Sequence, residues 1–129
     1  RWPGVEFTLH FHNTRGMGLA NVLAAIDAGA DRFDASLGGL GGCPYAPGAS
    51  GNVVTEDLVF MFESMGIATG VDLPRLLAAR EPLRIGLPGE PLYGMLPEAG
   101  LPPGWVPAAS TVVWTPVFSS PARHKKRIF

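Results

Sequence analysis

The eight residues VEFTLHFH, from Val5 to His12, decide how the rest of this 129-residue sequence is interpreted. Apolar residues occupy every second position of the segment, namely Val5, Phe7, Leu9 and Phe11. This period of two indicates a β-strand with one face in a hydrophobic core, and the phenylalanine, threonine and valine content favours the same structure. The polar face of the predicted strand ends with two histidines, His10 and His12.

The sequence after this strand continues as a helix and then as a second strand. Apolar residues recur at helical spacing from Met17 to Ala28, and Gly29 is placed to end that helix in a left-handed conformation. A short strand is expected from Arg32 to Leu37, where apolar and polar residues alternate again. A strand, a helix and a second strand in this order are typical of an α/β fold with parallel strands and right-handed connections.

Two more helices are expected further along the chain. Thr55 is predicted to cap a helix whose first turn holds Glu56 and Asp57, because the helix dipole favours negative charge there. Asp72 is predicted to cap a short helix from Leu73 to Arg80. Three strands at most can be counted, which is too few for a closed barrel.

The composition changes after Glu81, because nine of the thirteen prolines fall between Pro82 and Pro121. No helical or strand period is sustained in this region. We therefore divide the chain into an α/β part over residues 1–80 and a proline-rich tail over residues 81–129 that is expected to be extended or poorly ordered.

Composition and charge exclude several classes of function. The 47% of hydrophobic and 16% of charged residues fit one globular domain, and a formal net charge of −1 offers no basic face for nucleic acid. No apolar run approaches the roughly 18–20 residues that cross a bilayer. A single cysteine excludes an internal disulfide and suits a reducing compartment such as the cytoplasm. We expect neither a nucleic-acid nor a membrane partner.

The two histidines are the first candidate functional residues. Two positions apart on a strand, His10 and His12 leave the same face with Cα atoms about 6–7 Å apart, which suits two imidazoles that converge on one metal ion. They also lie where ligands gather in parallel α/β folds, beyond the carboxyl end of a strand. The alternative is that they are ordinary polar residues at a strand end. Asn52 is equally open, because its amide oxygen can ligate a hard cation, yet asparagine after glycine is common in turns.

The only cysteine, Cys43, lies in the glycine-rich segment GLGGCPYAPGASGN that ends at Asn52. A free cysteine is usually a small buried hydrophobe, but its glycine and proline neighbours offer little for it to pack against. The alternative is a loop thiol over a site, which could donate or accept a proton or act as a nucleophile. The segment holds neither GxGxxG nor GK[ST], which argues against a nucleotide-binding loop.

The remaining polar residues carry no functional prediction. Asp34 and Ser36 alternate with the apolar face of the second strand. They could line the interior of a barrel or merely bond within it, and the second interpretation is preferred. Asp31, Asp57 and Glu63 are interpreted as solvated.

Three stretches taken together, LHFHNTRGMGLAN, GLGGCPYAPGASGNVVTEDLVFMFESMGI and TGVDL, resemble the 3-hydroxy-3-methylglutaryl-CoA lyase family. The resemblance covers about Val5 to Leu77 in order and spacing. The related carboligases share the His-x-His strand but lack GGCPY, so the cysteine segment favours a lyase. The resemblance implies an α/β fold that is part of a TIM (β/α)8 barrel, of which this chain would supply roughly the sixth to eighth βα units.

The resemblance also implies roles for single residues. His10 and His12 match two histidines that ligate a divalent cation, Mg²⁺ or Mn²⁺, and Asn52 matches an asparagine near or on that cation. Cys43 matches the loop cysteine that acts as general acid/base. The family cleaves a carbon–carbon bond of 3-hydroxy-3-methylglutaryl-CoA to give acetoacetate and acetyl-CoA, so the expected substrate is an acyl-CoA. The expected location is the cytoplasm, or the mitochondrial matrix in a eukaryote.

The sequence departs from the family in two respects. It lacks the Arg-Asp-Gly motif of the first barrel strand, and a whole barrel takes about 250 residues. The alternative to a lyase is therefore a catalytically incomplete fragment or interaction module that keeps remnant site residues. The missing N-terminal half, or a second copy in a homo-oligomer, is the expected partner, because an open sheet exposes an edge and an apolar face. A different 3-hydroxyacyl-CoA substrate also remains open.

Overall fold

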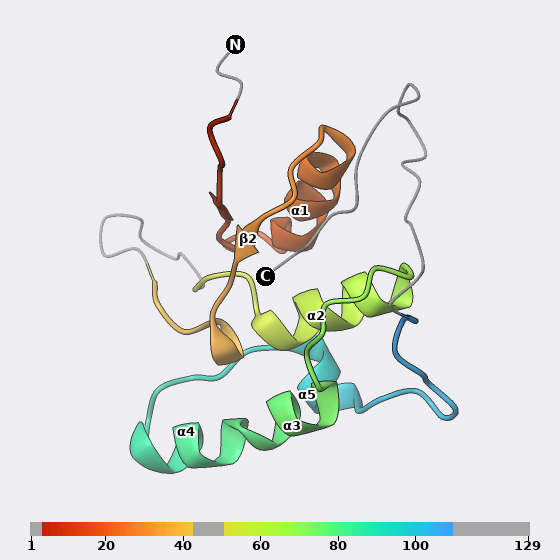
Figure 1. Ribbon diagram of the computed structural model, residues 1–129. Helices are drawn as coiled ribbons and strands as arrows, with labels where there is room; N and C mark the ends of the chain where they lie inside the picture. The colour runs from red at the N-terminus through yellow and green to blue at the C-terminus, as the bar shows by residue number, and fades with distance from the viewer. Residues whose placement is uncertain (1–3, 43–50, 110–129) are drawn as a thin grey trace.

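The computed structural model describes residues 4–42 and 51–109, whose helices and strands are shown in Figure 1. In chain order they are β1 (Leu9–His10), α1 (Gly18–Asp27), β2 (Phe33–Asp34), the 3-10 turn η1 (Leu37–Gly39), α2 (Thr55–Ser64), α3 (Leu73–Ala78), α4 (Arg80–Gly86) and α5 (Met95–Ala99). The order β1, α1, β2 confirms the predicted α/β alternation. Within the described ranges, no helix is long and apolar enough to cross a membrane.

The two strands pair in parallel, as predicted, with Leu9 opposite Phe33 and His10 opposite Asp34. Both are much shorter than the predicted strands over 5–12 and 32–37. A strand is defined by its ladder, and in the part of the chain that the structure describes no backbone hydrogen bond joins residues 5–8 to a neighbouring strand. The alternating pattern therefore identified the correct segment, but only its paired portion forms a ladder.

A short third segment, residues 51–54, runs across the carboxyl ends of both strands. The Val53 amide donates to the carbonyl of Phe11 at 3.0 Å, and the Ser36 amide donates to the carbonyl of Val53 at 3.1 Å. Isolated bridges place Asn52 against His12 and Val54 against Ser36. Polar side chains from three separate parts of the sequence therefore meet at one edge of the sheet.

Helix α2 lies in the middle of the structure (Figure 1). The strands and α1 pack on one side of it, and α3 and α5 pack on the other. The first hydrophobic cluster joins α1, β2, the segment 51–54 and α2; it consists of Val22, Ile26, Phe33, Val53, Leu58, Phe62 and Ile67. The second cluster joins α2 to α3 and α5 through Val59, Leu73 and Leu96. Because α2 contributes to both clusters, it links the strands to the C-terminal part of the chain.

One of the predicted helix caps is confirmed and one is wrong. The Asp72 side chain accepts a hydrogen bond from the Arg75 amide at 3.0 Å and caps α3. Thr55 is instead the first residue of α2, and Val54 occupies the cap position without a side-chain hydrogen bond. The Thr55 amide donates to the carbonyl of Ser36 at 2.9 Å, so a backbone partner from the strand region takes the place of a cap.

The expectation of an extended or poorly ordered tail after Glu81 is wrong for residues 81–109, because this region contains most of α4 and all of α5. Pro82 and Pro97 each lie in the first turn of their helix, where the missing amide hydrogen would have had no intrahelical partner. Prolines at these positions are therefore compatible with a helix. The predicted third helix also ends at Ala78 rather than at Arg80, where α4 begins.

Candidate functional site

The two predicted histidines lie together at the carboxyl end of β1. The ring centroids of His10 and His12 are 5.1 Å apart, and the rings meet edge to face at an interplanar angle of 71°. His10 ends the paired strand, and His12 makes the bridge to Asn52. The spacing of two therefore brings both imidazoles to the edge that the segment 51–54 crosses.

His10 is oriented by an acidic residue of the neighbouring strand. Its Nδ1 atom lies 2.7 Å from Oδ1 of Asp34, its parallel partner in the sheet. A carboxylate only accepts hydrogen bonds, so Nδ1 of His10 donates, and in the neutral ring Nε2 is then the nitrogen that carries the lone pair, as in histidines that bind metals. Asp34 carried no functional prediction from the sequence. The signal that could have identified it is its position next to His10 in the parallel register.

Asn52 presents an amide oxygen that has no hydrogen-bond partner among residues 4–42 and 51–109. Its Nδ2 atom donates to Oγ of Ser36 at 2.8 Å and to the carbonyl of Leu40 at 2.6 Å, which fixes the orientation of the amide. Its Oδ1 atom is buried and accepts no hydrogen bond from the described residues. A buried acceptor without a donor is costly in a folded protein. The Oδ1 atom of Asn52 is suited to be an oxygen ligand of a hard cation.

The glycines at the start and end of the cysteine segment allow this arrangement. A Cβ atom on Gly51 would overlap the carbonyl oxygen of Gly39, and one on Gly41 would lie 2.8 Å from Nδ2 of Asn52. Gly39 and Gly41 also adopt positive φ angles of 67° and 95°. Glycine is therefore required where the chain passes close to Asn52.

Cys43 lies outside the described residues, as does the rest of the segment 43–50. Of the described residues close to its two ends, Gly51 precedes Asn52 in the sequence and Gly41 lies against the Asn52 side chain. Within the described ranges, no three His, Cys, Asp or Glu side chains are grouped so that they could hold a metal ion by themselves. The donors brought together at this edge are two imidazoles and one amide oxygen.

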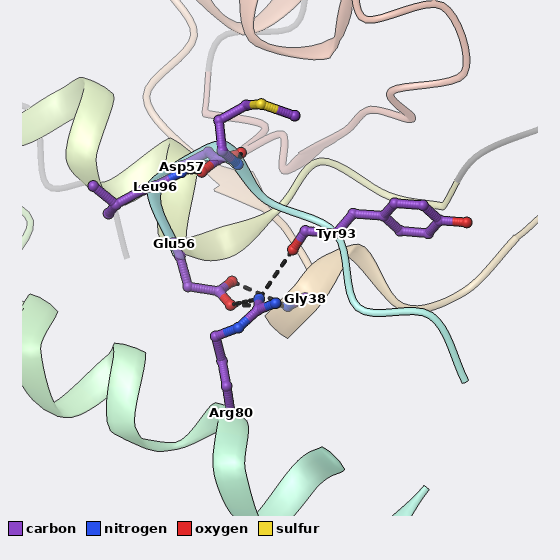
Figure 2. A network of polar contacts seen from close by, with 7 residues as sticks. Gly38, Glu56, Asp57, Arg80, Tyr93 and Leu96 are labelled. Atoms are coloured by element: carbon purple, nitrogen blue, oxygen red, sulfur yellow. Dashed lines mark hydrogen bonds and ion pairs between the residues drawn. The ribbon is translucent and has the colours of Figure 1, made fainter. Parts of the chain in front are cut away.

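A second polar cluster connects this edge to the C-terminal region (Figure 2). Glu56 in the first turn of α2 is fully buried, and its carboxylate accepts hydrogen bonds from the Gly38 amide at 3.0 and 3.2 Å. Arg80 forms an ion pair with Glu56 and also donates to the carbonyl of Tyr93 at 2.9 Å. The Tyr93 amide donates to the carbonyl of Gly38 at 2.8 Å. This cluster fastens residues 92–94 to η1, directly before the cysteine segment.

The prediction that Asp57 and Glu63 are solvated is wrong for both. Asp57 accepts hydrogen bonds from the first two amides of α5, at 2.9 and 2.8 Å. Glu63 is 5% exposed and accepts from the amide and hydroxyl of Thr69 and from the amide of Ala108 at 2.7 Å. Both residues hold the C-terminal region against α2.

Comparison with known proteins gives a consistent result. The HMGL-like family profile matches residues 3–82. The chain is 51% identical over 100 residues to an (R)-citramalyl-CoA lyase of Chloroflexus aurantiacus, covering 78% of this chain and 31% of that protein. It is 57% identical over 79 residues to a hydroxymethylglutaryl-CoA lyase of Bacillus subtilis, covering 61% of this chain and 26% of that one.

The structural comparison agrees with the sequence comparison. An HMG-CoA lyase of Acinetobacter baumannii, solved in complex with coenzyme A and 3-methylmalate, superposes with a TM-score of 0.68 at 57% identity, over 78% of this chain and 32% of that chain. The chain thus spans between a quarter and a third of the length of these relatives. Its two parallel strands and its helices match part of their fold.

Proposed function

Because this chain belongs to the HMGL-like family, we propose that it is the C-terminal part of a divalent-metal-dependent lyase acting on a 3-hydroxyacyl-CoA. On 3-hydroxy-3-methylglutaryl-CoA the products would be acetoacetate and acetyl-CoA. The observation that carries the proposal is the buried Oδ1 of Asn52, which accepts no hydrogen bond from the described residues and belongs to a residue bridged to His12, whose ring contacts that of His10. Relatives named as lyases of acyl-CoA substrates support the substrate class.

The donor set fits a divalent cation. Nε2 of His10 and the imidazole of His12 would supply nitrogen ligands, and Oδ1 of Asn52 an oxygen ligand, to Mg²⁺ or Mn²⁺. When bound, such a cation supplies Lewis acidity that favours loss of the proton from the substrate hydroxyl and stabilises negative charge. Asp34 would hold the His10 ring in its ligating orientation.

The cysteine would supply proton transfer. Cleavage of the bond between C2 and C3 of the acyl group follows deprotonation of the 3-hydroxyl, which becomes the ketone of acetoacetate. The electron pair of the broken bond becomes the enolate of acetyl-CoA. The Cys43 thiol would act as general acid/base in this reaction, protonating C2 of the enolate.

A complete site needs more of the barrel than this chain contains. We propose that the remaining strands come from the same polypeptide or from another chain, and that the assembled protein acts in the cytoplasm or mitochondrial matrix. Phe7 on the unpaired part of the first strand is 61% exposed, which supports a partner at this edge. The second candidate is a catalytically incomplete module that retains the site residues. The exposure of Phe7 favours this candidate if no other chain covers it.

Metal binding and cleavage test these alternatives together. Mn²⁺ affinity is measured by calorimetry, and cleavage of 3-hydroxy-3-methylglutaryl-CoA by acetoacetate release, for the chain alone and for the chain combined with the N-terminal part of a lyase barrel. The lyase proposal expects both activities in the combined sample. Absence of binding and of cleavage in both samples would contradict it, and binding without cleavage would favour the incomplete module.

Three variants separate the proposed roles. His12→Ala should abolish both Mn²⁺ binding and cleavage, whereas Cys43→Ala should lower turnover with Mn²⁺ affinity unchanged. Asn21→Ala on the exposed face of α1 is the control and should change neither. Equal loss of Mn²⁺ affinity in the histidine and cysteine variants would refute the division of roles.

A further inference from the structure

Residues 92–94 of the C-terminal region form a strap that lies against the site edge. The Tyr93 amide and carbonyl are both engaged, the first by the carbonyl of Gly38 at 2.8 Å and the second by Arg80 at 2.9 Å. Leu92 packs so tightly on Gly38 that a Cβ atom there would lie 2.9 Å from its Cδ2 atom. The backbone of the strap is thus fixed on both sides of Tyr93, and the side chain has no part in holding it.

The Tyr93 side chain starts next to Gly39, which also lies against the backbone of Asn52. A Cβ atom built on Gly39 would lie 3.6 Å from Cβ of Tyr93 and 3.2 Å from the backbone oxygen of Asn52, so the two residues flank the same glycine. Figure 2 shows the ring projecting away from Arg80 and Glu56. The residue is 45% exposed. A large aromatic side chain on a fixed backbone is therefore presented to solvent where the cysteine segment begins and ends.

We propose that Tyr93 contacts the acyl group of the substrate and helps to determine which 3-hydroxyacyl-CoA is accepted. This inference rests on the proposed lyase function. A phenol hydroxyl donates a hydrogen bond to a carboxylate or carbonyl oxygen, and its ring covers an apolar substituent. The acyl group of such a substrate offers both, and under the proposed function its hydroxyl end would bind at the edge to which Asn52 belongs. Tyr93 lies beyond residue 82, where the match to the HMGL-like profile ends.

Two variants of Tyr93 test the contact in the assembled protein. Tyr93→Phe removes only the hydroxyl and should lower kcat/KM for 3-hydroxy-3-methylglutaryl-CoA about 3–10-fold, as expected for one hydrogen bond. Tyr93→Ala removes the ring as well and should change the preference between this substrate and citramalyl-CoA, which differ in the acyl group. Ile85→Ala on the exposed side of α4 is the control and should leave both values unchanged.

Binding gives a readout that does not depend on turnover. The affinity of the free acid 3-hydroxy-3-methylglutarate, measured by calorimetry, should fall in Tyr93→Phe by a factor similar to that in kcat/KM, with the thermal midpoint unchanged. An active wild type whose Tyr93→Ala variant matches the Ile85→Ala control in affinity and in preference would overturn the role of Tyr93 and leave the lyase standing. A wild type that neither binds nor cleaves would overturn both proposals.

Discussion

The ion pair between Arg80 and Glu56 is the contact whose removal should cost the most stability in the C-terminal region. Arg80 is 17% exposed and its partner is fully buried, whereas in the Arg84–Glu81 pair of the same helix the side chains are 70% and 57% exposed. We predict that Arg80→Met lowers the free energy of unfolding by about 3 kcal/mol, the lower end for a buried pair that loses one partner. The lower end applies because Glu56 keeps its hydrogen bonds with the amide of Gly38.

Arg84→Met is the matched control, because it makes the same substitution four residues later in α4. Hydrogen bonding to Arg84 lowers the pKa of Glu81, but the pair is solvated, so we expect no measurable change in stability. The helix dipole alone predicts the opposite order, since it favours a cation in the last turn, where Arg84 lies, and disfavours one at Arg80 in the first turn. The two variants therefore separate burial from the dipole.

Urea denaturation of the wild type and both variants, followed by tryptophan fluorescence and far-ultraviolet circular dichroism, measures the difference. A third variant, Glu56→Gln, should lose a comparable amount, and the double variant with Arg80→Met should lose less than the sum. The reasoning is refuted if Arg80→Met and Arg84→Met agree within about 0.5 kcal/mol, the range usual for exposed positions.

Three further predictions concern the site edge and α2. Gly51→Ala should lower the thermal midpoint strongly, because its methyl group would overlap a backbone carbonyl of η1, whereas Gly86→Ala, with open space around it, should not. Asp57→Ala should cost about 1 kcal/mol in urea denaturation, because α5 loses the acceptor of its first two amides, while Asp57→Asn keeps one acceptor oxygen and should lose less. Asp34→Asn should weaken Mn²⁺ binding about tenfold in calorimetry by releasing His10, and an unchanged affinity would remove Asp34 from the proposed site.

Local patterns in the sequence predicted the elements that depend on near neighbours. Alternation and helical spacing located β1, α1 and β2, and Asp72 was correctly predicted to cap α3 because its partner is the amide of Arg75, three residues away. The grouping of His10 and His12 follows from strand geometry alone. Their proximity to Asn52 was expected only from the family resemblance, because it depends on how a distant segment crosses the sheet.

The features that the sequence did not predict depend on long-range partners. Glu56 was predicted only to lie in the first turn of a helix, and its buried ion pair is with an arginine 24 residues away. Asp57 and Glu63 were expected to be solvated, but their partners are amides 38, 39 and 45 residues away. A periodic pattern cannot show such contacts. The high proline content concealed α4 and α5 because proline disfavours the interior of a helix but not its first turn.

Three carboxylates of α2 hold the C-terminal region, namely Glu56, Asp57 and Glu63. Because of them, the range matched by the family profile and the range that packs together are different. The match to the HMGL-like profile ends at residue 82, but the contacts that hold the fold together continue beyond it. A chain cut there would lose the acceptor-bound amides of α5 and Ala108, the strap at Gly38, and Leu96 from the second hydrophobic cluster. A truncation designed from the profile boundary would thus remove the donors to Asp57 and the Ala108 donor to Glu63, whereas one designed from the contacts would end no earlier than Ala108.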